Sequence, residues 1–189
     1  MDTRDAILAA ARTLQAEGDG TFSLRAVARK VGLSPMAIYR HFADKEALQQ
    51  ALLESGHSHL LMALQAGILA ETPRARLATT LSAYARFAQE DPGTYRLLFE
   101  QHFQRPATSK QADRRSSATF RLLTDRVREC CASHDLPSAD PEQLALDLWA
   151  LLHGHILLHR AGKTGMDDEA LHTHLAGLLD RLFPPGYTV

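Results

Sequence analysis

Residues 22–48 contain two short apolar stripes, which a glycine and a serine–proline pair separate. The first stripe repeats at three- and four-residue spacing, as one face of a helix does: Leu24, Val27, Ala28 and Val31. Ser23 stands where a side-chain oxygen caps the opening turn of a helix, and Gly32 stands where a left-handed residue ends one. Ser34 and Pro35 then predict a second helix, with Pro35 at its first position. This stretch therefore predicts two helices joined by a tight turn.

The second of these helices has its inward side at Ile38 and Phe42, four residues apart. We expect the other side chains of this helix to lie largely outside: Met36, Ala37, Tyr39, Arg40 and His41. From Arg25 to Lys45 there are five basic residues and one acid, although the whole chain has a net charge of −1. Local positive charge on a helix, turn and helix indicates a helix-turn-helix motif, whose second helix enters the major groove of DNA.

The stretch VGLSPMAIYRHFADKEAL closely resembles the DNA-binding signature of the TetR/AcrR family of bacterial transcription regulators. The positions that carry the resemblance are Gly32, Tyr39, His41, Phe42, Lys45 and Leu48. It covers residues 1 to about 60 strongly and the rest of the chain in length and helical layout. The resemblance implies a homodimeric, ligand-responsive transcription regulator, usually a repressor, that a small molecule releases from a palindromic DNA operator.

Two kinds of DNA contact are expected from this motif. Tyr39, His41 and Lys45 would hold phosphates, which fix the register of the protein on DNA. The start of the preceding helix would add Thr21, Ser23 and Arg25, and the start of the recognition helix adds Ser34 and Pro35. Met36, Ala37 and Arg40 would face base edges, where Arg40 can donate two bonds to a guanine. Two alternatives stay open, namely that Tyr39 packs under its helix and that Arg40 contacts a phosphate.

The remaining chain is predicted to be all-α, with about nine helices in total, because no segment alternates with a period of two. The expected helices span 3–17, 45–70, 72–90, 94–103, a segment after a polar loop at 104–117, 141–161 and 167–183. We expect a DNA-binding domain at 1–48 and an effector-binding and dimerisation domain at 49–189. The helix that begins at Lys45 would join the two.

The penultimate helix is apolar over much of its circumference and therefore needs cover on more than one side. Trp149, His153 and Gly154 resemble the Trp–His–Gly signature in the C-terminal domain of one TetR subgroup. In the family the last two helices form a four-helix dimer bundle, which implies residues 142–162 and 167–183 here. Gly154 would allow close approach of the partner's helix; alternatively, it is a packing glycine inside one subunit.

The resemblance also implies a small-molecule site among the middle helices, with an apolar or aromatic effector expected. Seven residues are candidate wall residues, each of which could instead be a core residue: Tyr84, Phe87, Phe99, Phe103, Phe120, Trp149 and His153.

No catalytic residue, metal site or cofactor is predicted, because the chain has no HExxH, CxxC, GxSxG or glycine-rich phosphate loop. His155 with His159, or Cys130 with Cys131 or His134, could still have a metal or redox role. We expect a cytoplasmic protein, because no secretory signal or apolar run of about 18 residues is present. Two rival functions remain: a helical protein–protein adaptor, and a small-molecule-binding bundle that does not bind an operator.

Overall fold

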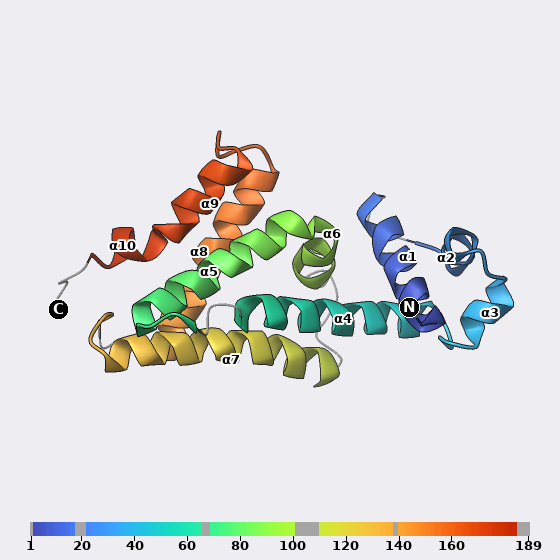
Figure 1. The fold of residues 1–189 in the computed structure, drawn as a ribbon, viewed down its shortest axis with the longest axis horizontal. Helices are drawn as coiled ribbons and strands as arrows, with labels where there is room; N and C mark the ends of the chain where they lie inside the picture. The colour runs from blue at the N-terminus through green and yellow to red at the C-terminus, as the bar shows by residue number, and fades with distance from the viewer. Residues whose placement is uncertain (1, 18–21, 66–68, 101–109, 138–139, 185–189) are drawn as a thin grey trace. The chain divides into compact units, whose positions relative to one another are not determined.

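The computed structural model describes residues 2–17, 22–65, 69–100, 110–137 and 140–184, and these residues are helical without a strand. The helices, shown in Figure 1, are α1 (Thr3–Glu17), α2 (Leu24–Val31), α3 (Pro35–Tyr39), α4 (Lys45–Gln65), α5 (Pro73–Glu90), α6 (Pro92–Tyr95), the π-helical turn η2 (Arg96–Glu100), α7 (Lys110–Ala132), α8 (Pro141–Arg160), α9 (Asp168–Ala176) and α10 (Leu178–Leu182). The predicted all-α fold is confirmed.

The chain divides into two compact units. Unit 1 comprises Met1–His59 and Asp91–Thr108, and unit 2 comprises Leu60–Glu90 and Ser109–Val189. Unit 1 thus contains α1 to α3, most of α4, and α6 with η2, whereas the remaining helices belong to unit 2. The expected functional division after residue 48 stays a prediction.

The first three helices pack around a common core. Its fully or nearly buried side chains come from each helix and from the start of α4: Ile7, Ala11, Val27, Ala28, Ile38, Phe42 and Leu48. Helix α2 packs against both α1 and α3. Because α2 and α3 have only eight and five residues, their stability depends on this packing.

Side-chain caps fix the ends of these short helices as predicted. The Ser23 Oγ accepts a hydrogen bond from the N–H of Ala26 at 3.1 Å, and the Ser34 Oγ accepts one from Ala37 at 3.2 Å. Gly32 ends α2 at φ 68° and ψ 28°, in the left-handed region that favours glycine. Asp44 Oδ1 accepts from the N–H of Ala47 at 2.7 Å and so begins α4.

Residues 92–100 form part of unit 1, where they pack against α1. A Cβ on Gly93 would lie 2.8 Å from the Cβ of Ala16, so glycine allows α6 to approach α1 closely. The Arg96 Nη2 donates to the carbonyls of Gln15 at 3.1 Å and Ala16 at 3.2 Å. The predicted continuous helix 94–103 is wrong in its start and form, because Asp91 and Pro92 begin the helix earlier and η2 follows from Arg96.

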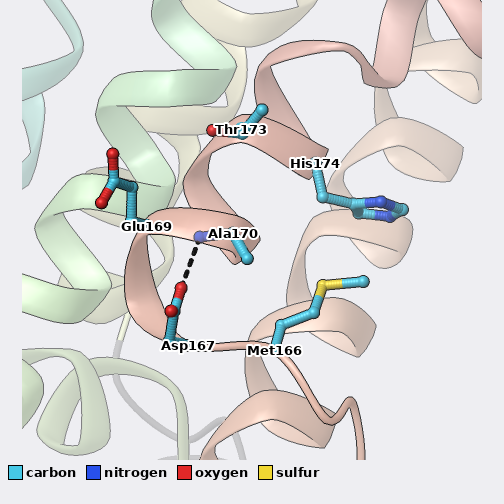
Figure 2. Close-up of a pocket in the computed structure, with 6 residues that line it drawn as sticks. All are labelled: Met166, Asp167, Glu169, Ala170, Thr173 and His174. Carbon is cyan, nitrogen blue, oxygen red and sulfur yellow. Dashed lines mark hydrogen bonds between the residues drawn. The ribbon is translucent and has the colours of Figure 1, made fainter.

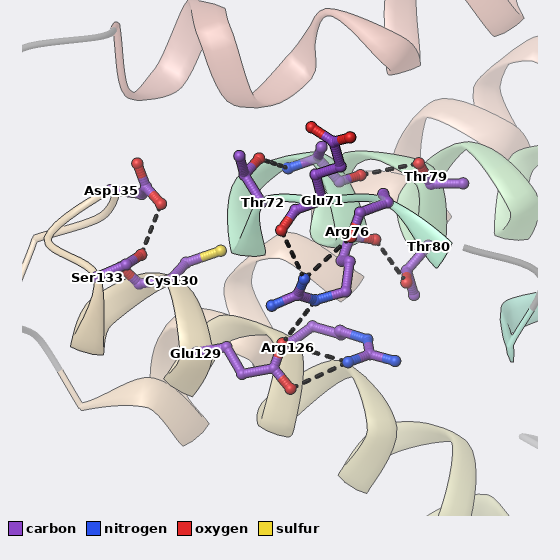
Figure 3. Close-up of polar contacts among 12 residues, drawn as sticks. Glu71, Thr72, Arg76, Thr79, Thr80, Arg126, Glu129, Cys130, Ser133 and Asp135 are labelled. Atoms are coloured by element: carbon purple, nitrogen blue, oxygen red, sulfur yellow. Dashed lines mark hydrogen bonds and ion pairs between the residues drawn. The ribbon is translucent and has the colours of Figure 1, made fainter. Parts of the chain in front are cut away.

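In unit 2, α5 packs against α7, α8 and α9. Two arginines of its first turns also tie it to other elements (Figure 3 draws Arg76). Arg76 donates to Glu129 of α7 at 3.1 Å and to the carbonyls of Ala70 and Glu71. Arg74 donates to Asp180 of α10 at 2.7 Å and to the Asp135 carbonyl at 3.1 Å. These bonds fix the start of α5, which leads to the candidate effector residues.

Two helix boundaries in unit 2 differ from the prediction. Helix α7 begins at Lys110, inside the segment expected to be a loop. The last predicted helix, 167–183, is two helices, α9 and α10, which meet at Gly177. Glycine has a low helix propensity, and the Arg181 Nη2 bonds to the His174 carbonyl across this break.

Candidate nucleic-acid interface and effector-binding cluster

The outer side of α3 carries most of the predicted base-facing and phosphate-facing residues. Met36 is 73% exposed and Tyr39 is 51% exposed, and the side chains of Ser34, Pro35, Arg40 and His41 are also exposed. The exposure of Tyr39 does not fit the alternative that it packs beneath its helix. A row of this kind, on a short helix held by caps, has the form of a recognition helix.

Ala37 is a correction to this set. Its side chain is only 7% exposed, because it lies with Ile38 on the buried side of α3, where α2 packs. The expectation that Ala37 lies outside is therefore wrong. Little of its methyl group is available to touch a thymine.

The phosphate candidates lie at the ends of the motif. Arg25 is exposed near the start of α2, and Ser23 is exposed while its oxygen caps that helix. A capping hydroxyl that accepts from the backbone still has its own O–H to donate. The Lys45 Nζ lies 5.5 Å from the centroid of the Phe22 ring, a cation–π contact that positions it at the start of α4. Thr21 lies outside the described residues.

Several other cations of unit 1 are bonded within the unit. The Lys30 Nζ pairs with Glu17 at 3.0 Å, and the Arg12 Nη2 donates to the Ser55 Oγ at 2.9 Å. Within the described ranges, no ion pair is found for Arg25, Arg29 or Arg40. These arginines are therefore available for an external anion.

Four of the predicted effector residues come together in unit 2. The Tyr84 Oη and His153 Nε2 are hydrogen-bonded at 2.6 Å, between α5 and α8. The Trp149 ring meets His153 edge-on at 4.6 Å between centroids, and Phe120 of α7 meets Trp149 at 6.0 Å. Burial lowers the pKa of His153 to about 4, so its imidazole is neutral at pH 7. The cluster combines aromatic surface with one neutral hydrogen-bonding pair.

The other predicted effector residues are placed differently. Phe87 is buried on α5. Phe99 belongs to unit 1, where its ring lies 5.1 Å from that of Tyr95, so the structure does not assign it to the cluster of unit 2. Phe103 lies outside the described residues.

Sequence reasoning missed an open hollow of about 540 Å³ on unit 2 (Figure 2). It is lined by Met166, Asp167, Glu169, Ala170, Thr173 and His174, none of which was an effector candidate. Its walls come from α9 and the residues just before it, a segment of the predicted dimer surface. A sequence pattern gives no signal for such a hollow, because it depends on the path of the chain into α9.

The histidines and cysteines bear on the metal and redox alternatives. His159 bonds to Asp168 at 2.9 Å and to Thr164 at 3.1 Å, whereas the His155 ring lies beside His174. In the part of the chain that the structure describes, no group of three or more His, Cys, Asp or Glu residues could hold a metal ion. Burial is the main cause that raises the pKa of Cys130 to about 12, which makes this thiol a poor nucleophile.

Helix α8 exposes large apolar side chains outside the core of unit 2: Leu146, Leu151, Leu157 and Leu158. Gly154 lies on the same helix, and a Cβ added to it would meet no atom within 4 Å. The alternative that Gly154 is needed for packing inside one subunit is therefore wrong.

Comparison with known proteins identifies the family. A model described as "Bacterial regulatory proteins, tetR family" matches residues 7–52. A second, described as "Tetracyclin repressor-like, C-terminal domain", matches residues 77–182, more than half of the chain. The chain belongs to the TetR family. It is a TetR-family transcription regulator, as the helix-turn-helix signature predicted.

Solved structures agree with this assignment. A Rhodococcus sp. RHA1 protein of unknown function is 30% identical, with a TM-score of 0.83 and coverage of 97% of this chain and 96% of that one. A bacterial regulatory protein of the tetR family from Rhodococcus RHA1 is 22% identical, with a TM-score of 0.79 and coverage of 99% and 100%. AibR, solved with isovaleryl coenzyme A and operator DNA, is 19% identical, with a TM-score of 0.77 and coverage of 97% and 100%.

The last two structures are less than 25% identical to this TetR-family chain, so they support only its fold. As for a membrane, no helix within the described ranges has the length and apolar character to cross one.

Proposed function

We propose that this TetR-family regulator is a repressor that binds a palindromic operator as a homodimer and leaves it when a small molecule binds to unit 2. The observation that carries the proposal is the exposed outer side of α3, which Ser34 caps just after Gly32 ends α2. Caps and a buried Ile38 fix the orientation of this helix before DNA arrives, so little ordering is needed on binding.

Each candidate residue for DNA binding has a proposed task. Tyr39, His41 and Lys45 hold phosphates, with Arg25 and Ser23 beside the start of α2, and Thr21 as a further candidate. Met36 and Arg40 face base edges, and Ser34 and Pro35 bring the start of α3 to the groove. An arginine can bond bidentately to a guanine, whereas phosphate contacts carry no sequence information directly.

Dimerisation is proposed through α8 and the α9–α10 segment. The exposed leucines of α8 make an apolar surface that a second copy would cover, and Gly154 leaves room for a close approach. A two-fold dimer places two recognition helices about 34–36 Å apart, one turn of DNA. The two-fold symmetry is why we expect a palindromic operator, and the spacing sets the separation of its half-sites.

The effector is proposed to bind at the cluster of Tyr84, Phe120, Trp149 and His153, with Phe87 as a further wall residue. Aromatic rings suit an apolar or aromatic molecule, and the Tyr84–His153 pair suits one polar group on it. We infer from Trp149, His153 and Gly154 that the C-terminal domain falls in the Trp–His–Gly subgroup.

Helix α4 is the proposed signal carrier, because it runs unbroken from Lys45, beside the recognition helix, to Gln65. Effector binding would change the position of this helix and hence the distance between the two recognition helices. A shift from mostly bound to mostly released needs about 5 kcal/mol of differential effector affinity for the two states. We further propose that the protein works in the cytoplasm, without a cofactor and without catalysis.

Two substitutions test the roles in α3. Tyr39→Ala should weaken binding to all DNA sequences alike, because it removes a phosphate contact. Arg40→Ala should weaken binding and also relax the preference at one base pair, by about 1–3 kcal/mol. Fluorescence anisotropy on the operator and on single-base variants measures both effects. An unchanged site preference in Arg40→Ala would assign Arg40 to a phosphate instead.

The same assay separates the rival functions. A protein–protein adaptor would bind no DNA with a salt-dependent affinity. A small-molecule-binding bundle would bind its ligand with the same affinity whether α3 is intact or altered.

A further inference from the structure

We propose that Arg4, in the first turn of α1, is a further phosphate contact that flanks the recognition helix. The inference rests on the proposed DNA binding and adds a contact from outside the helix-turn-helix motif. It starts from the Arg4 guanidinium, whose Cζ lies 5.0 Å from the centroid of the Phe42 ring.

The Phe42 ring holds Arg4 at the DNA-facing side of unit 1. Phe42 is 4% exposed and comes directly after His41, a proposed phosphate contact, and two residues after Arg40. Arg4 itself is exposed. A guanidinium has five N–H donors, and a cation–π contact uses its positive charge without needing all of these donors. The remaining donors can bind a phosphate while the contact with Phe42 stays in place.

Lys45 provides a counterpart at the other end of the motif. Its Nζ lies 5.5 Å from the centroid of the Phe22 ring, just before α2, as Arg4 lies over Phe42, just after α3. Two cations from the first turns of α1 and α4 thus lie against the two rings that bracket the motif. Since Lys45 is a proposed phosphate contact, the matching arrangement favours the same role for Arg4.

The position of Arg4 is unfavourable for the free protein. A cation in the first turn of a helix opposes the helix dipole. No ion pair of Arg4 is found within the described ranges, and the neighbouring Asp5 projects about 100° further round the helix. In contrast, Lys30 and Arg12 already have partners inside unit 1. A DNA phosphate would provide Arg4 with the missing opposite charge.

The alternative is that Arg4 only stabilises Phe42. The loss of an exposed cation–π contact would lower stability slightly, and it would not change how binding depends on salt. Salt dependence therefore separates the two roles, because each neutralised phosphate adds about 0.9 to the slope of log K against log salt.

The test uses the whole chain and the DNA site that it selects from a random-sequence library. Arg4→Gln should reduce the slope by about 1.8 per dimer, since two contacts are lost, and the loss of affinity should be about ten times larger at 0.05 M than at 0.2 M salt. Arg4→Lys should keep most of the slope. Lys30→Gln is the matched control, because it removes one charge from the same unit at a residue that already has a partner.

Arg4→Met is a second neutral variant, for use if Arg4→Gln unfolds at a lower temperature than the unmodified protein. Its apolar side chain can still pack over Phe42. A reduced slope in either neutral variant, with the Lys30→Gln slope unchanged, supports the inference. Slopes equal to that of the unmodified protein in both neutral variants would overturn it, while the proposed function stands. An unmodified protein with no salt-dependent DNA binding would overturn both.

Discussion

Replacement of Gly154 by alanine tests the proposed dimer surface on α8. Within one protomer the added methyl group meets no atom within 4 Å, so no internal clash arises. Alanine in a helix interior is favoured over glycine by about 1 kcal/mol. This gain is the same in the free protomer and in the dimer, and it therefore cancels in the association equilibrium.

A partner helix that passes close to Gly154 would meet the new methyl group. Overpacking typically costs 1–3 kcal/mol, and a two-fold interface repeats the contact, so the dimer loses roughly 2–6 kcal/mol. With 1.4 kcal/mol for each factor of ten, the dissociation constant should rise by about 30-fold or more. Sedimentation velocity over a range of concentrations measures this change.

Two controls complete the Gly154 experiment. Circular dichroism at concentrations where both proteins are monomeric should show that Gly154→Ala melts at no lower temperature than the unmodified protomer. Ala150→Gly, one turn away on the same helix, should lower that melting temperature without adding bulk to the surface. An unchanged or tighter dimer in Gly154→Ala would refute the reasoning that a partner helix approaches at this residue.

Three further predictions concern stability and are each measured by thermal unfolding. Gly32→Ala should destabilise by about 1 kcal/mol, because φ is 68° and no clash adds to the strain, and Gly32→Asn should lose less. Glu129→Gln should destabilise the fold by about 2 kcal/mol, because Glu129 accepts hydrogen bonds from Arg76 and from the nearly buried Arg126. Asp125→Asn is the control: Asp125 belongs to an exposed ion pair, so this variant should lose under about 0.5 kcal/mol of stability. Stability should decrease as the pH is lowered from about 6.5 towards 4, because His153 is neutral in the folded protein and binds a proton more readily in the unfolded chain. His153→Gln should reduce this loss of stability.

Each of these three has a result that contradicts it. Equal melting temperatures for Gly32→Ala and the unmodified protein would mean that this turn tolerates a side chain without strain. If Glu129→Gln lost no more than Asp125→Asn, the two arginines would be satisfied by other groups. A loss of stability below pH 6.5 that persists undiminished in His153→Gln would have to come from other residues.

The helix-turn-helix motif was predictable because its signals are local. Ser23, Gly32 and Ser34 each act on backbone groups within a few residues of their own position, and the structure has all three as predicted. The prediction for Ala37 was wrong because α3 has only five residues, and the buried side of this helix is wider than the single stripe of Ile38 and Phe42 indicates. A pattern over one turn is too short to fix that width.

The parts that were missed depend on contacts between distant residues. Nothing local reveals that residues 92–100 join unit 1, because the evidence is Gly93 against Ala16 and the Arg96 bonds to the end of α1. The assignment of Phe99 to the effector set was made without that information. Likewise the pair of Arg76 and Glu129 spans 53 residues, and neither residue carried a signal in its own helix.

The central claim is that this protein recognises one DNA sequence as a dimer, and selection from a random-sequence DNA library tests it most directly. We expect enrichment of one roughly palindromic site, which the purified protein binds tightly and with an affinity that falls steeply as salt rises. No enriched sequence, together with equally weak binding to all DNA at every salt concentration, would contradict it.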